Sequence, residues 1–136
     1  MGIFDSLKPK YRHSDHEKRL EGIEKLEDNA ILLDMVLNDP EKEVRLAAFD
    51  KISFPGYFPL IAVRSHDADI RKMAFERIES CDDYAHVAKL SHEEHSKKRA
   101  INEISTVGVL ENLKSDIHHS LHPHIDERIR ELKRKK

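Results

Sequence analysis

The sequence repeats itself with a period of 26 residues, and this rhythm constrains the fold more than any other feature. The segment 43–52 (EVRLAAFDKI) aligns with 69–78 (DIRKMAFERI) when the chain is shifted by 26 positions. The same shift adds 17–26 on one side and 95–104 on the other. Periods of roughly 20 to 50 residues are typical of stacked structural units, each of which buries its apolar face against the next. We therefore expect one structural unit to recur along most of the chain.

Four columns of the repeat each keep one kind of side chain. They hold a basic, a small, a large apolar and an aliphatic residue: Arg19, Arg45, Arg71 and Lys97; Gly22, Ala48, Ala74 and Ala100; Ile23, Phe49, Phe75 and Ile101; Leu26, Ile52, Ile78 and Ile104. Apolar residues within a unit fall at spacings of three, four and eight, which is one face of a helix and not the alternation of a strand. The small column predicts a close approach by a neighbouring helix.

A weaker pattern between these segments predicts a second helix in each unit. Apolar residues recur at two positions that lie three residues apart: Leu32, Phe58, Tyr84 and Leu110, followed by Met35, Ile61, Val87 and Leu113. Each unit is therefore expected to hold two short helices, of roughly 10 and 13 residues.

The segments between the helices carry residues that start and stop helices. Pro55 and Gly56 break the chain between two units, and Ser65 and Ser91 are expected to cap the helices that follow them. An acidic residue stands four positions before each basic one: Asp15–Arg19, Glu41–Arg45, Asp67–Arg71 and Glu93–Lys97. This order predicts ion pairs along each helix and negative charge in its first turn.

Helix pairs this short cannot bury an apolar face alone, so they must stack. We predict an all-α fold, an α-α superhelix or solenoid of about five short helix pairs. It forms a single domain, residues 1–136. Residues 13–115 hold the regular repeats, residues 1–12 form an N-terminal cap segment, and residues 116–136 form an atypical C-terminal capping helix.

Two successive units share a motif of turn and helix residues: Asp39-Pro40, Val44-Arg45 and Ala48 in one, and Asp67, Ile70-Arg71 and Ala74 in the next. This motif resembles the HEAT-like repeat family in its short prokaryotic, PBS-lyase-like form. The resemblance implies a solenoid whose second helices line the concave side. It also implies an interaction scaffold in most members, and an enzyme in a minority such as metal-dependent hydroxylases, bilin lyases and DNA glycosylases.

Composition narrows the function classes. Lys and Arg total 24 against 26 Asp and Glu, and this near-neutral balance argues against a nucleic-acid binder that uses its whole surface. The longest apolar stretch, 30–37, is interrupted by Asp34 and is too short to span a membrane. The single Cys81 suits a reducing, cytoplasmic location. Its acidic neighbours Asp82 and Asp83 are expected to raise the pKa of its thiol and leave it unreactive.

Two acidic columns give the main functional prediction, a docking face for a basic segment of a protein partner. They lie seven residues apart in each second helix: Glu17, Glu43 and Asp69, and Glu24, Asp50 and Glu76. In the fourth unit the same positions hold His95 and Asn102, so the acidic face ends there. The alternative is an ordinary solvated helix face. We predict a non-catalytic scaffold without a cofactor, whose concave helix face binds the partner.

Histidines suggest a second hypothesis, a metal-binding protein or metal-dependent enzyme. Near the C-terminus they cluster at four positions: His118, His119, His122 and His124. Imidazole suits Zn, Ni, Cu or Fe, although Pro123 interrupts any continuous helix through the cluster. With the 26-residue period, His66, His92 and His118 are expected along one edge. A third hypothesis is nucleic-acid binding through the basic ends, residues 8–12 and 128–136.

Overall fold

The computed structural model describes residues 9–135, and this part of the chain is all-helical. It contains nine α-helices, two 3₁₀ turns and no strand, so the all-α prediction is confirmed. The elements are η2 (Lys10–Arg12), α1 (His16–Glu24), α2 (Asn29–Asn38), α3 (Lys42–Lys51), α4 (Tyr57–Arg64), α5 (Ala68–Glu76), α6 (Cys81–Leu90), α7 (Glu94–Glu103), α8 (Val107–Lys114), η3 (His119–Leu121) and α9 (His122–Arg134). None of these helices has the length and apolar character needed to cross a membrane.

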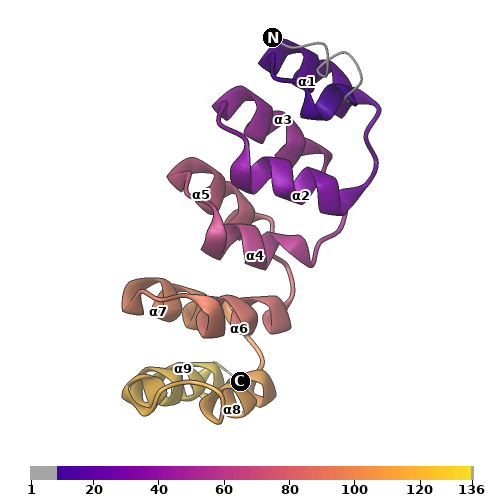
Figure 1. Ribbon diagram of the computed structural model, residues 1–136. Coiled ribbons are helices and arrows are strands. Elements are labelled where there is room, and N and C mark those ends of the chain that lie inside the picture. The colour runs from indigo at the N-terminus through magenta and orange to yellow at the C-terminus, as the bar shows by residue number, and fades with distance from the viewer. Residues whose placement is uncertain (1–8, 136) are drawn as a thin grey trace.

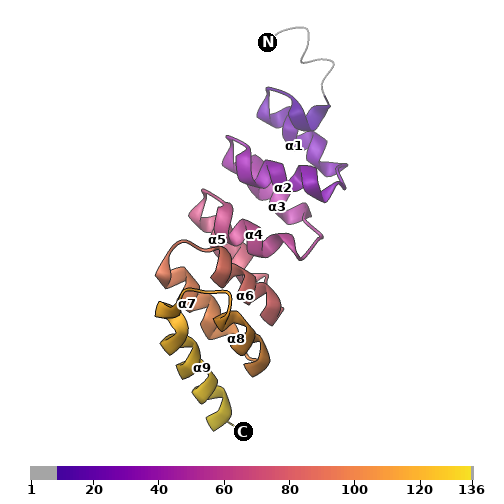
Figure 2. The same ribbon diagram turned by 60° about the horizontal axis from the view of Figure 1, so that its bottom comes forward.

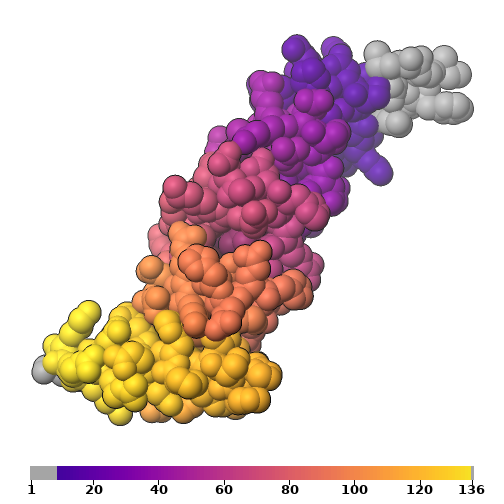
Figure 3. Space-filling model, turned by 90° about the vertical axis from the view of Figure 1, so that its left-hand side faces the viewer, coloured from indigo at the N-terminus to yellow at the C-terminus, as the bar shows by residue number. Residues whose placement is uncertain are grey.

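The helices stack in two rows to give an elongated molecule (Figures 1 and 3). Consecutive helices pair as α2–α3, α4–α5, α6–α7 and α8–α9, and η2 packs on α1. We call α2, α4, α6 and α8 the even row, and α1, α3, α5, α7 and α9 the odd row. Figure 2 shows the helices following one another along one axis, with α1 and α9 at opposite ends.

The two rows differ in how closely their helices pack. In the even row α4 packs against both α2 and α6, and α6 packs against α8. The ends of the odd row also pack, as α1 on α3 and α7 on α9, but α5 has little contact with either neighbour in its row. The odd row is therefore open around α5.

Ring pairs repeat between units with the period of the sequence. Phe49 and Phe58 lie with ring centroids 5.7 Å apart and planes inclined by 57°. Shifting both positions by 26 gives Phe75 and Tyr84, whose centroids lie 5.4 Å apart with planes inclined by 59°. Each pair joins an odd-row helix to the even-row helix that follows it. The same packing contact is therefore made twice.

The small column lies where the helices are most crowded. Ala48, Ala74 and Ala100 are each fully buried on an odd-row helix, as their common size predicted. The first member of the column is Gly22, and a Cβ built there would overlap the backbone of η2. Glycine therefore allows the N-terminal turn to pack directly on α1.

The aliphatic column lies just beyond the helices rather than on them. The odd-row helices α1, α3, α5 and α7 span only 9 or 10 residues, so the prediction of about 13 is wrong. The N–H groups of Ile52, Ile78 and Ile104 each donate to the carbonyl three residues back, at 3.1 to 3.2 Å. These isoleucines are at most 5% exposed. Each therefore closes its helix and anchors the following turn in the core.

The predicted serine caps are also wrong. Ser65 and Ser91 end α4 and α6, and the residues that precede the next helices at the N-cap position are Asp67 and Glu93. The Asp67 carboxylate accepts hydrogen bonds from the N–H groups of Asp69 and Ile70, at 3.0 and 3.3 Å. A carboxylate in this place satisfies the first orphan N–H groups of α5.

The two predicted end segments are described to different extents. Most of the predicted N-terminal cap, residues 1–12, lies outside the described residues. Within 116–136, α9 begins beside Pro123, which occupies its first turn where a missing N–H costs nothing. Its Ile125 is fully buried.

Candidate interaction surfaces

The basic column forms hydrogen bonds between successive units. Arg19 donates from Nε and Nη2 to the Asp39 carboxylate, at 2.9 and 3.1 Å. Arg45 donates from Nη2 to Asp67 at 3.2 Å and from Nη1 to the carbonyl of Asp39 at 2.8 Å. The sequence predicted that each arginine pairs with the acid four residues before it. That prediction is wrong for these two arginines, which pair with a carboxylate of the next unit. Arg19 and Arg45 therefore fasten one helix pair to the next.

Asp67 shows the electrostatic consequence of this fastening. Its side chain is 9% exposed, and burial opposes its ionisation. Hydrogen bonds from Arg45 and from the N–H groups of Ile70 and Asp69 outweigh that effect and hold the pKa of Asp67 below its usual value. Asp67 is thus both the N-cap of α5 and the acceptor of an inter-unit ion pair.

The six predicted partner-binding carboxylates are all exposed, on or beside the first three odd-row helices. They are Glu17, Glu24, Glu43, Asp50, Asp69 and Glu76; we call them the acidic face. Lys42, the first residue of α3, brings its Nζ to 2.6 Å from Oδ2 of Asp69 on α5. This contact raises the pKa of Lys42, chiefly through the hydrogen bond to Asp69. One member of the acidic face is therefore already paired.

The acidic face lies on the odd row, which is open around α5, whereas the even row packs more closely there. A basic residue also follows each member of the second acidic column along the chain: Lys25, Lys51 and Arg77. The acidic face therefore has basic residues next to its carboxylates in the sequence.

The C-terminal histidines do not converge on a metal site. The rings of His118 and His119 lie with centroids 4.1 Å apart and planes inclined by 34°. His122 brings Nε2 to 2.8 Å from the carbonyl oxygen of Lys114, and His124 brings Nε2 to 2.9 Å from Oδ1 of Asn102. Across residues 9–135, no three His, Cys, Asp or Glu side chains are placed to hold a metal ion. The helix that starts at His122 separates residues that the sequence places together.

The basic C-terminal end is partly neutralised by its own acids. The Glu127 carboxylate accepts hydrogen bonds from Arg130 at 2.7 Å and from Arg134 at 3.3 Å. These bonds hold the pKa of Glu127 below its usual value. Near the N-terminal end, Nζ of Lys10 lies 3.3 Å from Oε2 of Glu21.

No family model, curated protein or solved structure matches this chain. The resemblance to HEAT-like repeats stays a sequence-based prediction.

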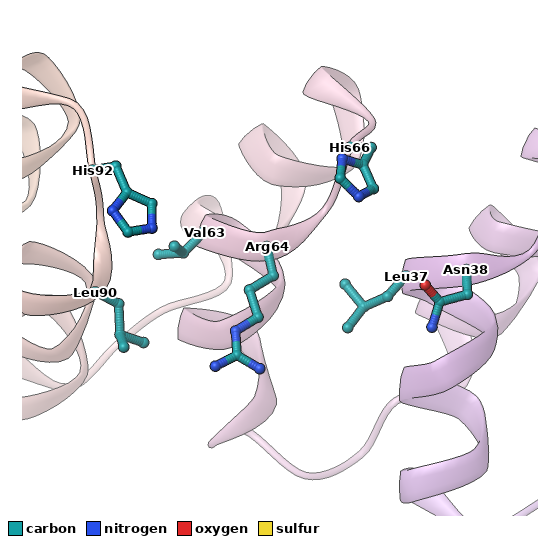
Figure 4. Close-up of a pocket in the computed structure, with 7 residues that line it drawn as sticks. All are labelled: Leu37, Asn38, Val63, Arg64, His66, Leu90 and His92. Atoms are coloured by element: carbon teal, nitrogen blue, oxygen red, sulfur yellow. The ribbon is translucent and has the colours of Figure 1, made fainter.

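An edge groove of about 530 Å³ runs past the C-terminal ends of α2, α4 and α6 (Figure 4). Its lining recurs with the 26-residue period: Leu37 and Val63; Asn38, Arg64 and Leu90; His66 and His92. Two of the three periodic histidines therefore line one edge, as predicted. Figure 4 shows Arg64 between the two histidine-bearing turns.

Cys81 has surroundings that its sequence neighbours did not indicate. It is the first residue of α6, and its Sγ lies 3.4 Å from Ser105 Oγ and 3.6 Å from Thr106 Oγ1. The bond with Ser105 leads the interactions that lower the pKa of the thiol, against the opposing effect of burial. The expected rise in its pKa is therefore wrong. An equivalent contact joins Asn29 to Ser53, which lie two periods before Cys81 and Ser105. The 26-residue repeat could therefore have indicated that Cys81 lies beside Ser105.

Proposed function

We propose that this chain is a non-catalytic scaffold that binds a protein partner carrying a basic segment, and that the acidic face is its docking surface. The observation that carries the proposal is the repetition of exposed carboxylates at two matching positions across three successive units. Seven residues of helix separate the two columns by roughly 10 Å. A basic segment laid across the odd row can meet carboxylates of several units at once.

The unpaired members of the acidic face identify where a partner's cations would bind. Among the described residues, only Asp69 of the six forms an ion pair, with Lys42. Glu43 and Asp50 occupy the middle of the face, on α3. Their exposure lets them attract a partner's cations at long range, which raises the association rate and so strengthens binding. The Debye length is about 8 Å at physiological ionic strength, so binding should weaken as salt is added.

Charge reversal in the middle of the face tests this function. We expect a fluorescent lysine-rich peptide to bind the wild-type chain, and the double variant Glu43→Lys, Asp50→Lys to bind it about tenfold more weakly or worse. The matched control is Glu79→Lys, Glu111→Lys, which makes the same change in net charge at exposed sites off the face. Fluorescence anisotropy at low and physiological salt gives the affinities.

The control makes the proposal decidable. Retained binding by Glu79→Lys, Glu111→Lys with loss in the other double variant supports docking at the acidic face. Equal loss in both variants would mean that the peptide responds to net charge alone. Unchanged binding in both would remove the acidic face as the docking site.

A further inference from the structure

A cleft of about 510 Å³ opens between α5 and α7, on one of the two loosely packed sides of α5 in the odd row. Phe75 of α5 and Val87 of α6 supply apolar lining, together with Ala62 of α4. Small-molecule sites typically have volumes of about 300 to 1,000 Å³ and combine apolar walls with a few polar groups. The cleft meets the edge groove of Figure 4 at Val63, Arg64, His66 and His92.

The charged lining of this cleft is strongly unbalanced. Three arginines and a lysine line it, with three histidines and one carboxylate: Arg64, Arg71, Arg99 and Lys72; His66, His92 and His95; Glu93. Within residues 9–135, no carboxylate oxygen lies within 4.0 Å of any of the four cations. A concentration of cations in a concave site focuses positive potential and attracts anions.

Two of these arginines are held by neutral groups. Arg71 donates from Nη1 to the carbonyl of Ser65 at 2.8 Å. The guanidinium of Arg99 lies over the Phe75 ring, 4.2 Å from its centroid. Both contacts fix the side chain without neutralising it. Guanidinium N–H groups therefore remain available to a ligand in the cleft.

Comparison between units shows what this position lacks. Arg19 and Arg45 occupy the same column as Arg71, and each binds a carboxylate supplied by the next unit. The residue 22 positions after Arg71 is Glu93, which corresponds to the Asp67 that pairs with Arg45. Glu93 is exposed and does not pair with Arg71. This unit keeps the cation and lacks the internal anion.

We infer that the cleft between α5 and α7 binds a small molecule carrying a phosphoryl group, which takes the place of the missing carboxylate. Arginine pairs with phosphate oxygens through two parallel N–H groups, and two arginines of this lining are held in place by neutral groups. Asp69 and Glu76 on α5 belong to the acidic face and would repel a long polyanion. A compact ligand is therefore favoured over a nucleic acid.

Isothermal titration of the full chain with pyrophosphate and with ADP tests this site. The wild-type chain should bind, and Arg71→Gln and Arg99→Gln should each weaken binding about tenfold or more, because each loses a charge-assisted contact. Lys98→Gln is the matched control. Lys98 also lies on α7 but does not line the cleft, and it pairs with Glu94. The affinity of Lys98→Gln for both probes should stay within about twofold of wild type.

A second variant guards against misfolding. Lys72 is exposed and makes no hydrogen bond or ion pair with the described residues. Lys72→Gln should therefore fold normally, with an unchanged circular dichroism spectrum, and still lose affinity several-fold. Tighter binding of ADP than of pyrophosphate identifies an organic phosphate, equal binding identifies an inorganic one, and both support the site.

Three results would overturn the inference. One is the absence of binding to either probe at millimolar concentration. Another is equal weakening by Lys98→Gln and Arg71→Gln, which would make the attraction general to the surface. The third is displacement of ADP by a single-stranded oligonucleotide that binds more tightly than ADP does, which would assign the cleft to nucleic acid.

Discussion

At the scale of single residues, the role of an arginine in this chain depends on what the next unit supplies. Arg45 finds the Asp67 carboxylate at 3.2 Å, whereas Arg71 finds only the carbonyl of Ser65. The sequence identified the basic column, because an arginine or lysine recurs every 26 residues. It misassigned the partner, because residues four apart on a helix are an obvious pair and residues 20 or 22 apart are not.

Asp67 gives a stability prediction at this scale. Replacing it by alanine removes the N-cap of α5 and the ion pair with Arg45. We expect Asp67→Ala to lower the free energy of unfolding by about 2 kcal/mol at neutral pH. Urea denaturation measures the loss. The control Asp50→Ala, at an exposed residue of the same charge, should change stability by less than about 0.5 kcal/mol.

The same substitution has a pH dependence with a definite sign. Because folding lowers the pKa of Asp67, its contribution is present above the unfolded-state pKa and is lost as pH falls through the lower folded-state value. The stability difference between wild type and Asp67→Ala should therefore shrink below about pH 4. An undiminished difference in strong acid would show that the charge of Asp67 does not stabilise the fold.

At the scale of elements, the helices and their buried faces followed from the sequence, but their ends did not. The apolar pattern at spacings of three and four identified α3, α5 and α7, together with the buried alanines on them. It overextended these helices, because Ile52 and Ile78 continue the pattern although each lies beyond the end of a helix. An apolar residue that anchors a turn and one on the last helical turn give the same signal.

The small column predicts how these elements respond to added volume. Ala74 is fully buried on α5, so Ala74→Leu must displace its neighbours and should destabilise the chain by about 2 kcal/mol. Ala30 is exposed on α2, and Ala30→Leu should change stability by less than about 0.5 kcal/mol. Thermal and urea unfolding of both variants make the comparison. Equal stability for Ala74→Leu and wild type would mean that the column does not fill a tight slot.

At the scale of the whole molecule, the repeat predicted successive helix pairs but not the opening of the odd row around α5. That opening depends on how whole helices are spaced, which no single position of the repeat records: Glu41 and Glu93 occupy equivalent positions, yet α3 packs on α1 and α7 has little contact with α5. The histidine cluster failed for a related reason. His118 to His124 are neighbours along the chain, yet their rings have separate partners from α8, from α7 and within the turn.

The central claim is that one packing unit recurs every 26 residues, and the paired rings test it most directly. We expect nuclear Overhauser effects between the rings of Phe49 and Phe58, and equivalent effects between those of Phe75 and Tyr84, in a chain with labelled aromatic residues. Centroids 5.7 and 5.4 Å apart place ring protons within range in both pairs. Cross-peaks from both pairs would support the repeated stack. Their absence from either pair would contradict it.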